Sequence, residues 1–190
     1  MRTQFMDLSQ KEEMSLNLKG VFMLTSDQII TLFNLKPHLE EGGYFVETYR
    51  SSETISEKAL PSRYKGVRSF GTAIYYLLTL ETFSSIHRLR SDEIFHFYLG
   101  APVEMLQLWP DGSGRVLILG SDILNGMQPQ VVVPRGVWQG AKLLKGGKFA
   151  LLGTTVSPGF EFIDYESGHR DELVKSYPQY REWIIALTKY

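Results

Sequence analysis

The middle of the chain has the hydrophobic pattern of short β-strands, with apolar and β-branched residues that alternate with polar ones or run unbroken for a few positions. The first such run, Tyr44–Tyr49, follows two glycines and is rich in aromatic residues. Further strand-like segments recur from residue 71 onwards. They cover residues 72–80, 83–89, 93–99, 103–109, 116–119, 130–133 and 149–156. Many short strands without intervening helices predict a mainly β fold of the sandwich, barrel or jelly-roll type.

Helical spacing occurs at the two ends of this strand-rich region. Thr25 and Gln28 are spaced as a capping box, and the apolar residues after them share one helical face, which predicts a short helix from about Ser26 to Leu35. Near the C-terminus, a second helical pattern begins at Asp171, and Pro178 is suited to the first position of another. We expect this C-terminal helical segment to pack against the outside of the barrel.

The length and local polarity of the chain predict its domain organisation. With 190 residues the chain fits one domain that can bury most of its apolar surface. Residues 1–20 carry only scattered apolar positions and are predicted to form a flexible N-terminal arm, while residues 21–190 form the domain. The polar segment 51–66, which contains Pro61, is predicted to be a long surface loop.

The charge balance and the lack of cysteine narrow the classes of partner and compartment. Lys and Arg total 20 against 21 for Asp and Glu, so the basic excess typical of nucleic-acid binding is missing. The chain has no cysteine, which fits a reducing compartment and excludes thiolate metal sites. Its strongly apolar runs are too short to span a bilayer, and residues 1–13 lack the apolar centre of a signal peptide. We therefore expect a cytoplasmic protein that binds neither nucleic acid nor membranes.

The strongest candidate chemistry lies at His87 and Glu93, which are separated by one short turn between two predicted strands. Because side chains alternate across a strand, a turn at residues 90–92 lets both groups point into the same interior. Such a pair suits proton transfer or metal binding. The alternative is a buried hydrogen-bonded pair that only fixes two strands.

Several other residues are candidates for the same pocket. Trp138 and Gln139 begin a strand after the turn Pro134-Arg135-Gly136-Val137 and supply an aromatic wall and an amide; the alternative for Trp138 is that it fills the mouth of the barrel. Tyr75 and Tyr76 face opposite ways, and we take Tyr75 as the one that donates a proton, although core packing would also explain either tyrosine. His96 is a further ligand-binding candidate, but regular alternation turns it outward unless a bulge intervenes. Arg88 is a candidate for binding a phosphate or carboxylate, and the alternative for it is a solvated side chain.

These two blocks resemble the two sequence motifs of the cupin superfamily. His87, Glu93 and Gly100 match the spacing of the first motif, with Leu89 where that motif has its second histidine. The segment from Pro134 to Gln139 matches the second motif, with Gln139 in place of histidine. The resemblance implies a divalent metal ion held by His87, Glu93 and Gln139, but a neutral amide is a poorer ligand than imidazole for transition metals.

A closer resemblance covers roughly residues 25–187 and is to the cupin family catalogued as a domain of unknown function. It rests on ordered matches that include Gly42-Gly43-Tyr44-Phe45, Thr72–Leu78, Ser85–Leu89, Asp92–His96, Gln139-Gly140-Ala141 and Val156–Phe162. The resemblance implies a cupin-type double-stranded β-helix, the jelly roll shared with nucleotide-sugar epimerases and seed storage proteins, assembled as a homodimer. It implies no established reaction, so function must be argued from the site.

Two classes of function remain open. In the first, the chain is an isomerase or epimerase that acts on a sugar-like or nucleotide-sugar-like compound, with His87 as general base, Glu93 tuning it and a pocket tyrosine returning the proton. In the second, the same barrel binds a small metabolite without turnover. A metal-dependent oxygenase is the weaker alternative, because two of the expected imidazoles are replaced.

Overall fold

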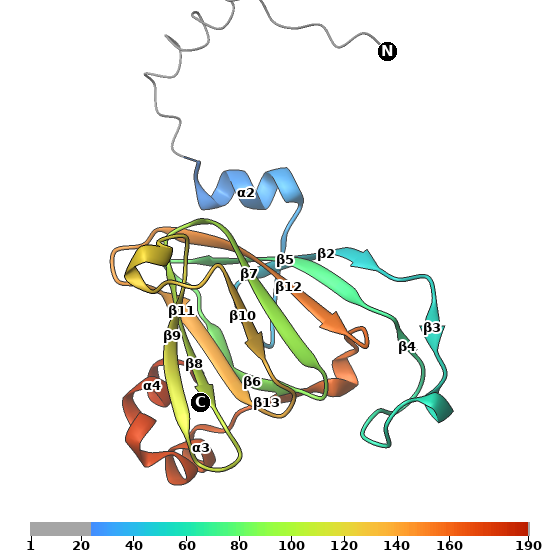
Figure 1. Ribbon diagram of the computed structural model, residues 1–190. Helices are drawn as coiled ribbons and strands as arrows, with labels where there is room; N and C mark the ends of the chain where they lie inside the picture. Colours follow the sequence, from blue (N-terminus) through green and yellow to red (C-terminus); the bar gives the residue numbers. More distant parts are fainter. Residues whose placement is uncertain (1–23, 190) are drawn as a thin grey trace, which may run out of the picture.

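The computed structural model describes residues 24–189, which form two antiparallel β-sheets packed face to face (Figure 1). The predicted flexible arm, residues 1–20, lies outside the described residues. The larger sheet has the strand order β1-β2-β5-β12-β7-β10. Its strands are β1 (Lys36–Pro37), β2 (Tyr44–Arg50), β5 (Thr72–Thr79), β7 (Asp92–Gly100), β10 (Gln130–Val133) and β12 (Phe149–Ser157).

The smaller sheet has the strand order β13-β6-β11-β8-β9. Its strands are β6 (Ser84–Leu89), β8 (Val103–Leu108), β9 (Gly114–Leu119), β11 (Trp138–Leu143) and β13 (Tyr165–Ser167). Strands β6 and β7 are consecutive in the chain but belong to different sheets, so the turn at residues 90–91 crosses between the two layers. His87 and Glu93 therefore reach the interior from opposite walls.

The segment predicted to be a long loop contains regular structure. Strands β3 (Thr54–Ile55) and β4 (Arg68–Ser69) pair as a separate two-stranded sheet, and a 3-10 helix spans Glu57–Ala59. In Figure 1 this part projects from the end of β2 beside the main sheets. Its few hydrophobic positions explain why the sequence pattern did not distinguish it from a loop.

The main hydrophobic core lies between the two sheets. Every second side chain of β5 points inward, so Ile74, Tyr76 and Leu78 pack against residues of the smaller sheet such as Met105 and Val103. The residues between them face outward, where Leu77 packs against Ile29 of the N-terminal helix, so both faces of β5 are covered. Tyr75, between two inward residues, points to the same outer face.

Helices cover the outer faces of both sheets. Helix α2 (Ser26–Phe33) has the predicted capping box between Thr25 and Gln28, and its Ile29 packs on Leu77 and Leu151 of the larger sheet. The C-terminal segment forms α3 (Arg170–Ser176), a 3-10 helix (Pro178–Tyr180) and α4 (Arg181–Ala186). These helices pack on the outer face of the smaller sheet, which confirms the predicted position of the C-terminal segment.

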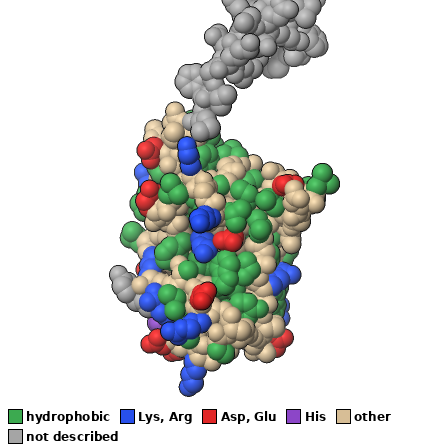
Figure 2. Space-filling model, turned by 90° about the vertical axis from the view of Figure 1, so that its left-hand side faces the viewer, with side chains coloured by type: hydrophobic (Ala, Val, Ile, Leu, Met, Phe, Trp, Pro, Cys, Tyr) green, Lys and Arg blue, Asp and Glu red, His purple; other side chains and the backbone are tan. Residues whose placement is uncertain are grey.

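The described surface agrees with the balanced composition. On the face shown in Figure 2, basic side chains are interspersed with acidic and hydrophobic ones. Among residues 24–189, no helix is long and apolar enough to cross a membrane.

Candidate functional site

A cavity of about 100 Å³ lies in the barrel interior beside the hydrophobic core. Phe45, Ile74, Leu89 and Phe160 contribute apolar wall, and ionisable side chains converge on it from both sheets. The ionisable groups are His38, Glu41, Glu47, Arg50, His87, Glu93, Glu161 and Tyr165, and Thr72 and Thr154 are further polar residues of the lining. A mostly apolar enclosure with a few convergent polar groups is typical of a small-molecule site.

The ring of His87 is held in one orientation by its neighbours on β6 and β11. Its Nδ1 lies 2.8 Å from the carbonyl oxygen of Ser85, which can only accept, so Nδ1 carries the proton in the neutral ring. Nε2 then has a lone pair and accepts a hydrogen bond of 3.2 Å from the amide nitrogen of Gln139. His87 is 1% exposed, so its basic nitrogen is directed within the barrel and away from bulk solvent.

Gln139 joins the imidazole to the carboxylate across the barrel. It lies directly opposite His87 in the pairing of β11 with β6, and its amide nitrogen also donates to Glu93 Oε2 from the other sheet. The predicted convergence of His87, Glu93 and Gln139 is thus present in the structure. His87 and Glu93 line the cavity, whereas Gln139 bridges them without lining it.

Glu93 is a carboxyl group whose protonation changes near neutral pH. Burial raises its pKa from 4.5 to about 7, and this desolvation outweighs the opposing effect of nearby His87. A group with such a pKa exists in both protonation states near pH 7. Perturbed pKa values of this kind are typical of functional sites.

Sequence reasoning did not assign His38, Glu41 or Tyr165 to the site, yet all three line the cavity beside His87. The amide N–H of Glu41 donates to His38 Nδ1 at 2.9 Å, so the neutral ring of His38 carries its proton on Nε2. Burial lowers the pKa of His38, which favours that neutral form. His38 and His87 therefore have opposite tautomers, with a donor at Nε2 of the first and an acceptor at Nε2 of the second.

Glu41 and Tyr165 both lie close to His87. Glu41 Oε2 is 3.8 Å from His87 Nε2, and its other oxygen accepts from the hydroxyl of Ser84 at 2.6 Å. The ring of Tyr165 stacks on that of His87 with centroids 4.9 Å apart and an interplanar angle of 20°. The Tyr165 hydroxyl is buried and makes no hydrogen bond to any described residue, and burial raises its pKa. It is therefore a protonated donor without a protein acceptor.

Two predicted site residues lie on the outer face of the larger sheet instead. Tyr75 packs against Phe33 of α2 and Tyr98, with ring centroids 4.9 and 5.9 Å apart. His96 Nε2 lies 3.1 Å from the hydroxyl of Thr155 on the same outer face. The register of β5 and β7 turns both side chains away from the cavity, so neither is placed to contact its ligand.

Trp138 and Arg88 lie outside the barrel on the smaller sheet. Trp138 packs among the residues that contact the C-terminal helices, and the guanidinium of Arg88 stacks over it at 4.3 Å. Arg88 also makes two hydrogen bonds to Glu166, of 2.7 and 2.9 Å. Since Trp138 precedes inward-facing Gln139 and Arg88 follows inward-facing His87, alternation places both outside, contrary to the prediction that they line the pocket.

The metal site that the sequence resemblance implies does not fit the residues present. In the described part of the chain, no three His, Asp or Glu side chains are arranged to hold a metal ion. Leu89 supplies no ligand atom, and Gln139 directs its amide nitrogen, which cannot bind a metal, at both His87 and Glu93. We therefore derive no step that uses a metal.

The two packed antiparallel sheets with a cavity between them define a jelly-roll barrel of the cupin superfamily, which confirms the predicted fold. The family model described as "Cupin superfamily (DUF985)" matches residues 27–168. The chain belongs to this family.

Known relatives agree with the assignment. The chain is 33% identical to the uncharacterized protein YML079W of Saccharomyces cerevisiae over an alignment of 146 residues. The alignment covers 73% of this chain and 72% of the yeast protein. The crystal structure of protein SO0799 from Shewanella oneidensis is similar with a TM-score of 0.77 and 33% identity, over 88% of this chain and 99% of that one. A hypothetical protein from Leishmania major gives a TM-score of 0.78 at 28% identity, over 88% and 100% of the two chains. Membership of the cupin superfamily supports a small-molecule-binding function.

Proposed function

We propose that the cavity is the active site of an isomerase or epimerase that moves a proton on a sugar-like or nucleotide-sugar-like compound. The observation that carries the proposal is the fixed tautomer of His87, whose basic Nε2 is joined through the amide of Gln139 to the buried carboxyl group of Glu93, which has a pKa of about 7. General bases work best when their proton affinity matches the operating pH.

In the proposed reaction, His87 takes a proton from a carbon next to a carbonyl group. The C–H bond breaks, its electron pair moves toward the carbonyl oxygen, and the hydroxyl of Tyr165 donates a hydrogen bond to that oxygen. The 3.2 Å bond from Gln139 to His87 Nε2 opens for this step, and ionised Glu93 stabilises the imidazolium that forms. The imidazolium then returns the proton to the former carbonyl carbon. The hydroxyl proton on the adjacent carbon moves to the former carbonyl oxygen as a new C=O bond forms at the adjacent carbon, so the product is an isomer of the substrate.

The position of Tyr165 favours isomerisation by one base over epimerisation. Its ring lies beside that of His87 in a near-parallel stack. Epimerisation requires a proton donor on the opposite face of the substrate from the base. Tyr165 thus replaces Tyr75 as the tyrosine of the mechanism, in the role of a hydrogen-bond donor to the substrate oxygen.

Exchange of substrate protons with solvent tests this function without knowledge of the product. The protein is incubated in D₂O with a panel of keto sugars and nucleoside-diphosphate keto sugars, and deuterium at the carbon beside the carbonyl is measured by NMR. We expect exchange with at least one compound, its loss in His87→Gln, and no change in the matched control His96→Gln on the outer face. Binding of a panel compound without exchange would instead show the alternative function, a metabolite-binding protein without turnover.

Two further parts of the proposal concern the assembly and location of the chain. We propose a homodimer, which the family resemblance implies, and a cytoplasmic location, which rests on the absence of cysteine. Light scattering after size-exclusion chromatography measures the assembly: a mass near twice 21.7 kDa supports the dimer, and a mass near 21.7 kDa contradicts it.

A further inference from the structure

A second concave site lies on the other side of the segment that carries Tyr165. Tyr165 lines the cavity, but its neighbours Asp164 and Glu166 line a surface depression of about 310 Å³. The two sites therefore share one short strand and face different directions. The other charged residues of the depression are Arg63, Arg88, Arg90 and Arg135.

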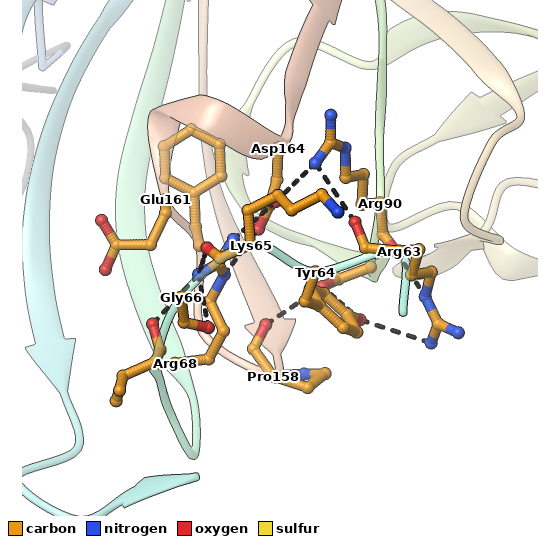
Figure 3. Close-up of polar contacts among 12 residues, drawn as sticks. Arg63, Tyr64, Lys65, Gly66, Arg68, Arg90, Pro158, Glu161 and Asp164 are labelled. Carbon is orange, nitrogen blue, oxygen red and sulfur yellow. Dashed lines mark hydrogen bonds and ion pairs between the residues drawn. The ribbon is translucent and has the colours of Figure 1, made fainter. Parts of the chain in front are cut away.

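The carboxylates of the depression are already bound to arginines. Both oxygens of Asp164 accept hydrogen bonds of 2.8 Å from buried Arg68, and both oxygens of Glu166 accept from Arg88. Arg90 comes within 4.0 Å of Asp164, at the limit of an ion pair. Figure 3 shows Asp164 directed between Arg68 and Arg90.

Among the described residues, the guanidinium groups of Arg63 and Arg135 make no ion pair with a carboxylate, and that of Arg90 reaches only Asp164, whose two oxygens Arg68 already binds. They come from three separate segments, namely the loop before β4, the turn between β6 and β7, and the turn between β10 and β11. Like charges gathered in this way repel one another, and a bound anion would remove that cost.

Hydrogen bonds hold these segments together before any ligand binds. Arg63 Nε donates to the carbonyl of Arg90, and Arg90 Nη1 donates to the carbonyl of Arg63, both at 3.1 Å (Figure 3). The turn that carries Arg135 is fixed by two more bonds: Gly136 N–H donates to Leu89 at 2.9 Å, and Arg135 N–H donates to Asp92 Oδ1 at 2.8 Å. A preorganised site pays a smaller entropic cost when it binds a ligand.

We propose that this depression binds the phosphate group of a small phosphorylated compound. Several guanidinium groups match a phosphate, which offers up to two negative charges and three acceptor oxygens. A small ligand is favoured over a nucleic acid because the arginines gather in one depression, while the chain as a whole has a net charge of −1. The site is separate from the proposed active site and does not depend on its chemistry.

Titration calorimetry with inorganic phosphate and with ribose 5-phosphate, at an ionic strength held constant with sodium chloride, tests the proposal. We expect both anions to bind, and Arg135→Gln and Arg90→Gln each to weaken binding at least tenfold. The matched control is Arg181→Gln, which removes the same charge from an exposed position at the start of α4 and should bind like the wild type. Tighter binding of ribose 5-phosphate than of phosphate would show that the body of the ligand also contacts the protein.

Thermal unfolding gives a second, independent measurement on the same variants. In phosphate-free buffer, Arg135→Gln should unfold at a higher temperature than the wild type because it relieves repulsion, and added phosphate should raise the wild-type midpoint more than that of the variant.

Equal phosphate affinities of Arg135→Gln and Arg181→Gln, or binding heats for phosphate no larger than those for chloride, would overturn the proposal. A single-stranded RNA that bound more tightly than ribose 5-phosphate would overturn the choice of a small ligand. His87→Gln should leave phosphate binding intact, which separates this result from any failure of the proposed active site.

Discussion

Two buried polar clusters in this barrel differ in how fully their hydrogen bonds are satisfied. In the first, Arg68 is 2% exposed and donates from all three of its nitrogens, two to Asp164 and one to backbone carbonyls of residues 65–67. In the second, the amide of Gln139 joins His87 to Glu93, but the hydroxyl of Tyr165, whose ring stacks on His87, has no partner among the described residues. Burial without full pairing costs stability, so the second cluster points to a role other than folding.

The largest effect is expected from breaking the fully paired cluster. Asp164→Ala leaves the charge of Arg68 buried without its partner and should lower the free energy of unfolding by about 3–5 kcal/mol. Urea denaturation measures the loss. The matched control Glu166→Ala breaks the exposed pair with Arg88, whose side chains are 55% and 36% exposed, and should cost less than about 1 kcal/mol.

A double variant distinguishes a structural pair from a functional one. Arg68→Met with Asp164→Leu replaces both charges by apolar groups and should recover most of the stability that Asp164→Ala loses. Equal losses in Asp164→Ala and Glu166→Ala would contradict the structural role of the Arg68 pair.

In the second cluster, removing the charge of Glu93 should raise the free energy of unfolding, whereas Asp164→Ala lowers it in the first. The raised pKa of Glu93 means that the folded state holds a proton that the unfolded state releases above pH 4.5. The stability that this proton contributes is complete below pH 4.5 and is lost as the pH rises to about 7. From the difference between 4.5 and 7, the wild type should lose on the order of 3 kcal/mol over that range relative to Glu93→Gln.

Urea denaturation of the wild type and of Glu93→Gln at pH 5 and pH 8 measures this difference. Glu166→Gln, at an exposed position, serves as the control and should follow the wild type at both pH values. A wild-type protein that gains stability relative to Glu93→Gln between pH 5 and pH 8 would show that the folded state favours the ionised carboxylate.

A smaller difference in stability is expected when the hydroxyl is removed from one tyrosine of each cluster. The hydroxyl of Tyr64, beside Arg68, lies 2.9 Å from that of Ser91, so Tyr64→Phe should cost about 1 kcal/mol. Tyr165→Phe removes a hydroxyl that no described residue binds and should leave stability unchanged or slightly higher. Thermal unfolding of the two variants compares their stabilities. If Tyr165→Phe lost as much stability as Tyr64→Phe, the Tyr165 hydroxyl would have a partner in the fold.

The strands and the terminal helices could be predicted because each follows from the local spacing of hydrophobic residues along the chain. Strand β10 was predicted with its observed bounds, and the capping box of α2 was predicted from two residues. Strand β13 has three residues and exists because it pairs with β6, so no local pattern indicates it. Tyr165, which lies on that strand, could not be predicted for the same reason.

Part of the candidate site could be predicted from local spacing. The directions of His87 and Glu93 follow from strand alternation and one turn, whereas Gln139 was placed beside them by the resemblance to the second cupin motif. Alternation also shows that Tyr75 and Tyr76 face opposite ways, but it cannot say which faces inward. That choice depends on the register of β5 against its neighbours, and a shift by one residue would exchange the two faces.

The central claim is that the barrel brings a basic ring nitrogen of His87 and the carboxyl group of Glu93, with its pKa of about 7, together at one cavity. Nitrogen-15 and carbon-13 NMR of the labelled protein measures both groups in one pH titration. The account predicts that the neutral ring of His87 carries its proton on Nδ1 and that Glu93 titrates with a midpoint near pH 7. A neutral His87 protonated on Nε2, together with a Glu93 midpoint near 4.5, would contradict it.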